Sequence, residues 1–278
     1  MVGLAVSGVV LLAGCTAFWG NTRKTERSSS VVNYLYPGEV NPLPPTEVPV
    51  LRLPLRVGIA FVPAGNARND YRPGGISEVQ KTALMERVAA EFKGRDYIQS
   101  IEIVPTSYLR PAGGFDNLNQ VRSLLNVDVI ALVAYDQVQF TNTNILSLAY
   151  WTIVGAYIFH GNKNDTDTLM EAAVYDIASR HLLFRSPGVS HVEAGAAAVY
   201  LEQSKRTDAA KGFDVATDDL IKNLKTQLED FRERVKKAPG QVARIEHRPG
   251  YSGGGAMDGW LVAALAALGL ARWRWRRQ

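Results

Sequence analysis

The chain has 278 residues, 46% hydrophobic and 21% charged, which excludes a wholly disordered protein and leaves room for one ordinary domain with appendages. Of its formal net charge of +4, residues 256–278 carry +3 through four arginines and one aspartate, so residues 16–255 carry only +1. This nearly neutral body argues against nucleic-acid binding, and the single cysteine excludes an intrachain disulfide and a thiolate metal cluster.

The first residues are typical of a secretory signal, because residues 1–14 are apolar or small, uncharged, and followed by the only cysteine. The motif Leu12-Ala13-Gly14-Cys15 resembles a bacterial lipobox, although the basic start of such signals is missing. The resemblance implies that lipoprotein maturation enzymes acylate Cys15 and cleave before it, which gives a stable membrane anchor. Thr16 is not the aspartate of inner-membrane retention signals, so the outer membrane is implied. The alternative is a buried cysteine in an N-terminal hydrophobic strand.

Residues 15–54 show no sustained helical or strand period and contain six prolines, at positions 37, 42, 44, 45, 49 and 54. Such a composition favours an extended, polyproline-like conformation. We therefore expect a tether between the lipid and the domain.

The domain is predicted to span residues 55–237 and to begin with alternating strands and helices. Leu55–Pro63 has the pattern of a strand, Ser77 and Gln80 form a capping box for a helix that ends before Gly94, and Ile98–Pro105 is a second strand. Leucines and a valine at positions 118–125 indicate a second helix, and residues 127–135 form an apolar run typical of a central strand. This order predicts a parallel sheet.

The second half of the domain changes pattern. Residues 140–159 are rich in aromatic and β-branched residues and favour a strand or hairpin, with an interfacial helix as the alternative, and residues 161–165 form a turn. Residues 168–177 and 182–185 indicate two antiparallel strands, and residues 193–205 and 213–237 two helices. The predicted fold class is α/β, a single three-layer domain with a mixed sheet, and its element order resembles the N-terminal domain of TolB.

The residues that could carry chemistry form no local catalytic motif. The four histidines lack metal-ligand spacing, and Ser190 beside His191 does not make a triad by adjacency. Asp128 and Asp136 fall at the two ends of the predicted central strand; Asp136 and the loop 66–75 are the best candidates for a ligand site. An enzyme with scattered residues around Asp136 and Asp176 is the alternative to a noncatalytic domain. No cofactor or metal is expected.

After a polar spacer, residues 238–251, the chain ends in a tail with three parts. Ser252-Gly253-Gly254-Gly255 is flexible, residues 256–271 form a short apolar segment, and residues 272–278 contain four arginines and two tryptophans. With 14 to 16 apolar residues, the segment is only marginally long enough to cross a membrane, and a plain C-terminal anchor is the alternative.

The tail resembles a GlyGly-CTERM sorting signal, which implies cleavage by rhombosortase, a rhomboid-type intramembrane protease. A lipobox joined to such a tail is similar to the rhombotarget lipoprotein family, for which no catalytic activity is implied. The expectation is a noncatalytic lipoprotein of the bacterial cell envelope, at the outer membrane or cell surface. Its domain is expected to bind an envelope partner or to assist envelope assembly.

Overall fold

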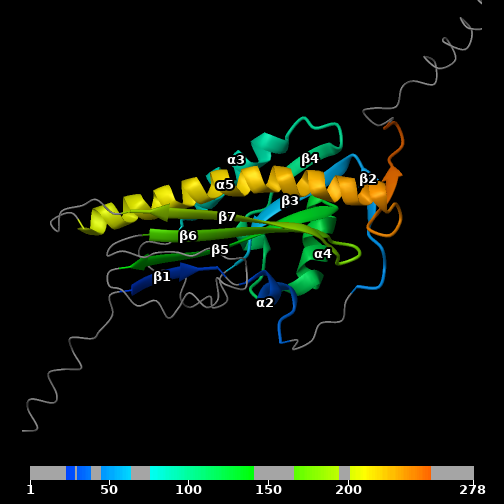
Figure 1. Cartoon of the computed structure of the whole chain (residues 1–278). Helices are drawn as coiled ribbons and strands as arrows, with labels where there is room; N and C mark the ends of the chain where they lie inside the picture. Colours follow the sequence, from blue (N-terminus) through cyan, green and yellow to red (C-terminus); the bar gives the residue numbers. More distant parts are fainter. Residues whose placement is uncertain are drawn as a thin grey trace, which may run out of the picture.

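A mixed sheet with helices on both faces forms the domain in the computed structural model of the chain (Figure 1). The structure describes residues 23–28, 30–38, 45–63, 76–140, 166–193 and 201–251. The strands are β1 (Arg23–Arg27), β2 (Val50–Leu53), β3 (Leu55–Phe61), β4 (Ile98–Ile103), β5 (Val129–Phe140), β6 (Thr166–Asp176), β7 (Leu182–Val192) and β8 (Arg244–His247). The helices are α2 (Val31–Leu35), α3 (Glu78–Phe92), the short 3-10 helix η2 (Thr106–Tyr108), α4 (Gly114–Leu125) and α5 (Leu201–Lys237).

The sheet has the order β4-β3-β5-β6-β7, and β1 pairs with the far end of β5. β3 is parallel to both β4 and β5, because a helix connects each successive pair of these strands along the chain. β6 and β7 continue antiparallel through the turn after Asp176. The predicted mixed sheet, parallel first and antiparallel afterwards, is confirmed.

Alternate residues of the central strands enter two separate hydrophobic cores. Ile59, Val129 and Met170 face α3 and α5, whereas their neighbours Ala60 and Ile130 face α2 and α4. Side chains of a strand point alternately to its two faces, so continuous apolar runs are required where both faces are covered. The three-layer arrangement predicted for this domain is therefore confirmed.

One continuous helix, α5, replaces the two helices expected at 193–205 and 213–237. It runs for 37 residues, about 55 Å, along β6 and β7 (Figure 1). Gly212, between the two expected helices, does not end the helix: a Cβ there would lie 2.5 Å from Thr168 Oγ1. The glycine thus allows the helix backbone to approach β6, and the tertiary contact outweighs the low helix propensity of glycine.

Side chains of α5 also cover the outer edge of β7. Asp219 accepts a hydrogen bond from the Val189 amide at 3.0 Å, Asn223 donates to the Pro187 carbonyl at 3.0 Å, and Arg234 donates to the Leu183 carbonyl at 3.3 Å. An edge strand with unpaired amides and carbonyls can pair with another chain. The helix reduces this risk by occupying these edge groups.

The central strand β5 is longer than the predicted 127–135, and the prediction that Asp136 ends it was wrong. The strand continues to Phe140, because β1 and β6 pair with its last residues from the two sides. Gln137 is 2% exposed, and its side-chain amide donates to Thr168 Oγ1 at 2.7 Å and to the Ala209 carbonyl at 2.9 Å. These bonds satisfy a buried polar group within a strand.

Two regions expected to be extended contribute ordered elements to the domain. Within the expected tether 15–54, β1 pairs with β5, α2 begins at the N-cap Ser30, and β2 precedes β3. Within the expected spacer 238–251, β8 pairs in parallel with β2. Both expectations are corrected for these residues, because pairing with distant strands cannot be recognised in a proline-rich or polar segment on its own.

Several predictions concern residues outside those that the structure describes. They are the lipobox residues Leu12, Ala13, Gly14 and Cys15, the loop 66–75, the segment 141–165, and the tail motif Ser252, Gly253, Gly254 and Gly255 with its apolar segment. Within the described ranges, no helix is both long and apolar enough to cross a membrane. The resemblance to the TolB domain stays a prediction.

Candidate functional site

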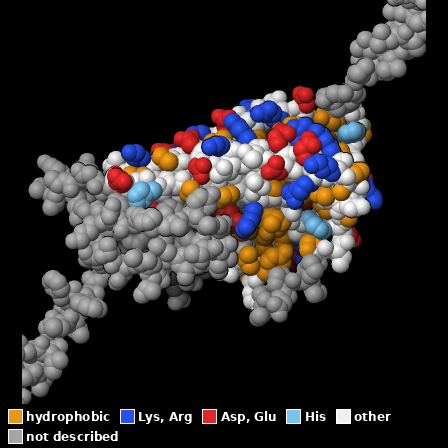
Figure 2. All heavy atoms as spheres, in the orientation of Figure 1, with side chains coloured by type: hydrophobic (Ala, Val, Ile, Leu, Met, Phe, Trp, Pro, Cys, Tyr) orange, Lys and Arg blue, Asp and Glu red, His pale blue; other side chains and the backbone are white. Residues whose placement is uncertain are grey.

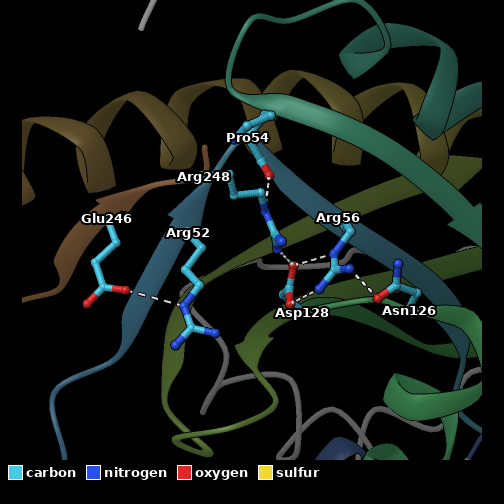
Figure 3. Close-up of polar contacts among 7 residues, drawn as sticks. All are labelled: Arg52, Pro54, Arg56, Asn126, Asp128, Glu246 and Arg248. Atoms are coloured by element: carbon cyan, nitrogen blue, oxygen red, sulfur yellow. Dashed lines mark hydrogen bonds and ion pairs between the residues drawn. The ribbon is translucent and has the colours of Figure 1, made fainter. Parts of the chain in front are cut away.

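The most highly connected group of charged side chains surrounds Asp128, just before β5 (Figure 3). Arg56 of β3 donates from Nε to Asp128 Oδ2 at 2.8 Å and from Nη2 to Oδ1 at 2.7 Å. Arg248, just after β8, donates from Nη2 to Asp128 Oδ2 at 2.5 Å and from Nε to the Pro54 carbonyl at 3.2 Å. Arg56 Nη1 also donates to Asn126 Oδ1. We call Arg56, Asn126, Asp128 and Arg248 the Asp128 cluster.

Parallel pairing brings the Asp128 cluster together. β3 and β5 lie side by side with Val57 opposite Val129, which places Arg56 beside Asp128 at the amino ends of both strands. β8 pairs with β2, and the Arg248 amide donates to the Leu53 carbonyl at 2.8 Å, so Arg248 arrives at the same place from the end of the chain. The cluster therefore lies at the sheet end opposite to the carboxyl ends where open α/β sheets usually bind ligands.

The charges of the Asp128 cluster are largely shielded from water, since the side chains of Asp128, Arg56 and Arg248 are 16%, 20% and 24% exposed. Burial by itself would raise the pKa of Asp128, but hydrogen bonds and charge from Arg56, then Arg248, together hold that pKa below its usual range. The hydrogen bonds that Arg56 donates to Asp128 in turn raise the pKa of Arg56. The carboxylate is thus ionised at neutral pH and binds two cations at once.

The Asp128 cluster binds the C-terminal segment to the domain through the ion pair between Asp128 and Arg248. The β2–β8 pair has only four residues in each strand, and all four residues of β8 are exposed. A nearby ion pair, Arg52 with Glu246 at 3.3 Å, is 60% and 45% exposed and adds little. Asp128, strand pairing and the buried Ala243 therefore together hold residues 244–251 on the domain.

The structure separates Asp136 from Asp176, which argues against the alternative of an enzyme site built around both of them. Asp176 pairs with Val129, seven residues along β5 from Asp136, a separation of about 24 Å. An odd residue separation also places the two carboxylates on opposite faces of the sheet. Asp176 Oδ2 accepts hydrogen bonds from the Ser179 amide at 2.9 Å and hydroxyl at 2.5 Å, so it closes the turn between β6 and β7.

Asp136 instead shares a sheet face with Asp167 and His191, on neighbouring strands. His191 Nδ1 lies 2.6 Å from Asp167 Oδ1, and the Asp167 side chain is 3% exposed. Ser190 points to the other face and donates its hydroxyl hydrogen bond to the Gly212 carbonyl at 2.8 Å. Ser190 and His191 are adjacent in the sequence but point to opposite faces of the sheet, so they do not form a nucleophile–base pair.

The remaining histidines in the described part of the chain do not come together with other side chains to form a ligand or metal site. His181 lies in the turn before β7, and His247 contacts the ring of Tyr251 with centroids 5.6 Å apart. Among the described residues, no group of three or more histidine, cysteine or carboxylate side chains is arranged to hold a metal ion. The outer face of α4 has a shallow open depression lined by Asn119, Gln120, Ser123 and Leu124.

No family model and no curated protein sequence matches the chain. Among solved structures, it is similar to a Xanthomonas campestris protein of the family DUF330, with 8% identity, 72% of this chain and 97% of that chain covered, and a TM-score of 0.34. The PelC dodecamer from Paraburkholderia phytofirmans has 10% identity, coverage of 70% and 97%, and a TM-score of 0.26. The uncharacterized lipoprotein B of Nitrosomonas europaea has 10% identity, coverage of 73% and 96%, and a TM-score of 0.26.

In the sequence, Asp128 can be recognised only as a residue at the start of a predicted strand, and neither Arg56 nor Arg248 can be recognised as its partner. Arg56 is one of several charged residues near the start of a strand, and Arg248 lies 120 residues from Asp128 in a segment without a recognisable pattern. No local signal pairs these residues, since the contact depends on β8 joining β2. The cluster is a product of the tertiary structure.

Proposed function

We propose that this chain is a noncatalytic cell-envelope lipoprotein, anchored through an acylated Cys15, whose C-terminal tail is removed by a rhombosortase-type intramembrane protease. The observation that carries the proposal is the motif Leu12-Ala13-Gly14-Cys15, which contains the only cysteine, together with Ser252-Gly253-Gly254-Gly255 before an apolar segment and four arginines. The α/β domain between them binds a protein partner or assists envelope assembly.

The positions of the first and last strands that the structure describes support a role for the tail that differs from permanent anchoring. β1, the first described strand, lies at one end of β5, and the β2–β8 pair lies at the other (Figure 1). β5 has 12 residues and is about 40 Å long. Two anchors in one membrane would hold the domain lengthwise along its surface. Removal of the tail would leave attachment at the β1 end alone and free the opposite end.

The ordinary structural roles of the polar side chains also support a noncatalytic domain. Asp176 accepts a hydrogen bond within a turn, Ser190 bonds β7 to α5, and Asp128 binds Arg248 of the C-terminal segment. A catalytic pair of carboxylates must lie within a defined short separation of the reacting bond. Asp136 and Asp176 do not meet this requirement, so an active site built from that pair is not part of the proposal.

Intact-mass spectrometry of the mature protein tests both ends together. We expect an acylated N-terminal Cys15 and a C-terminus between Gly253 and Ala256. In a Cys15→Ser variant we expect the acyl mass to be absent and the signal to stay attached, because the thiol is the only acceptor for the diacylglyceryl group. Recovery of Trp273 and Trp275 in the mature protein would contradict cleavage of the tail, and normal maturation of the serine variant would contradict lipidation.

A further inference from the structure

The C-terminal segment is held on the domain up to Tyr251. The Tyr251 amide donates to the Arg248 carbonyl at 3.1 Å, its ring contacts His247, and Arg248 itself is bound to Asp128. The apolar segment of the proposed tail begins at Ala256, and five residues extend over at most about 17 Å. If the tail enters a membrane as proposed, the end of the domain that carries β2 and β8 must lie at the surface of that membrane.

This end of the domain is basic, although the body of the chain is nearly neutral. The first twenty residues of α5, Leu201 to Leu220, contain three basic and five acidic residues, a net charge of −2. The last seventeen, Ile221 to Lys237, contain six basic and three acidic residues, a net charge of +3. Figure 2 shows lysine and arginine side chains gathered over this C-terminal half of the helix and the adjoining end of the molecule. The charge of α5 therefore changes sign along its length, from acidic to basic.

Local ion pairs do not cancel the surplus of positive charge. Glu229 pairs with Arg232, Glu233 with Lys236, and Glu246 with Arg52. Two further cations at this end, Lys237 and Arg244, are exposed and have no ion-pair partner among the described residues, and the exposed Arg234 donates only to the uncharged Leu183 carbonyl. We call Arg234, Lys237 and Arg244 the basic end. Exposed cations beside a membrane entry point are attracted to anionic lipid headgroups, by about fivefold in binding for each residue close to the surface.

We propose that the basic end docks on an anionic phospholipid surface and thereby holds Ser252–Gly255 at the level of the headgroups. The inference rests on the proposed membrane entry of the tail, and adds that the domain itself touches the bilayer in a fixed orientation. The anionic surface repels the acidic half of α5, so the lipid contact is confined to the basic end. Such contact would present the cleavage segment to an intramembrane protease at a constant depth.

Site-specific labelling of the full-length chain tests this orientation. In a Cys15→Ser background, Ile245→Cys and Val215→Cys provide single label sites with matched exposure, 39% and 42%, at the basic and acidic ends. The labelled protein is reconstituted in phosphatidylcholine vesicles with and without about one third phosphatidylglycerol, and quenching by headgroup spin-labelled lipid is measured. We expect quenching at residue 245 to be at least about twofold greater in the anionic vesicles, to fall in high salt, and to be unchanged at residue 215.

Charge reversal supplies the matched control. Lys237→Glu with Arg244→Glu should abolish the lipid-dependent quenching at residue 245, whereas Arg206→Glu with Lys211→Glu, an equal charge change in the acidic half of α5, should preserve it. Equal quenching at residues 245 and 215 in anionic vesicles that carry the protein would overturn the docking proposal alone. Residues 1–14, which are expected to stay attached in the Cys15→Ser background, are deleted for the flotation test. Failure of that protein to float with neutral vesicles would instead overturn the proposed membrane entry of the tail, so the two failures are distinguishable.

Discussion

Replacing Asp128 with asparagine is expected to lower the free energy of unfolding by about 2 kcal/mol and to release residues 244–251 from the domain. The substitution keeps the shape of the side chain but leaves Arg56 and Arg248, which are 20% and 24% exposed, without a neutralising charge. Breaking a fully buried pair costs about 3–5 kcal/mol, and partial exposure of this pair lowers the estimate. Chemical denaturation measures the global loss, and amide hydrogen exchange of β8 measures the local release.

Arg52→Gln is the control for this substitution. It removes the exposed ion pair with Glu246 in the same two strands and should cost less than about 0.5 kcal/mol. Protection of β8 should survive this change. Equal losses from Asp128→Asn and Arg52→Gln, or unaltered exchange of β8 in the Asp128 variant, would show that strand pairing holds the C-terminal segment without the cluster.

The contribution of Asp128 should depend on pH in the acidic range. Its pKa is lower in the folded protein than in the unfolded chain, so its stabilisation is complete above the unfolded value, about 4, and is lost as the pH falls through the folded value. The stability difference between the parent protein and Asp128→Asn should therefore be constant from about pH 5 to pH 7 and shrink below about pH 4. Denaturation curves at several pH values check this, and a difference that stays constant at the lowest pH would exclude an ionic origin.

Gly188→Ala is expected to destabilise the domain by about 3 kcal/mol, because β7 and α5 are in direct contact there. A Cβ at residue 188 would lie 2.3 Å from the Ala216 carbonyl oxygen and 2.6 Å from Leu220 Cβ. The first of these is a backbone atom of α5, so the clash cannot be relieved by a side-chain rotation. The helix would have to move away from β7, which would weaken the bonds that Asp219 and Asn223 make to the strand edge. Thermal and chemical unfolding measure the loss.

Gly58→Ala provides the matched comparison, since Gly58 is also a buried strand glycine. Its added Cβ would meet Val104 Cγ2 at 3.4 Å, an ordinary contact distance, and the expected change is within about 1 kcal/mol. If both substitutions proved equally tolerated, the close approach of α5 to β7 would be refuted. If both were equally damaging, the loss would reflect strand glycines in general and not this contact.

Elements with local signals could be predicted from the amino-acid sequence. The largely continuous apolar runs at 55–61 and 129–135 indicate strands covered on both faces, and Ser77 with Gln80 forms the capping box that starts α3. The order of these elements along the chain then restricts the first strands to a parallel sheet. The residues that resemble a lipobox and a sorting tail are likewise contiguous, so these predictions need no structure.

Features that join distant residues depend on long-range packing and could not be predicted in this way. Whether α5 continues through Gly212 depended on the space beside Thr168, and whether residues 23–27 and 244–247 form strands depended on partners more than 100 and 190 residues away. The pairing of Asp128 with Arg248 and the concentration of positive charge at one end follow from the same long-range contacts. A neutral composition contains no information about where charges lie in space, because folding alone sets their distances.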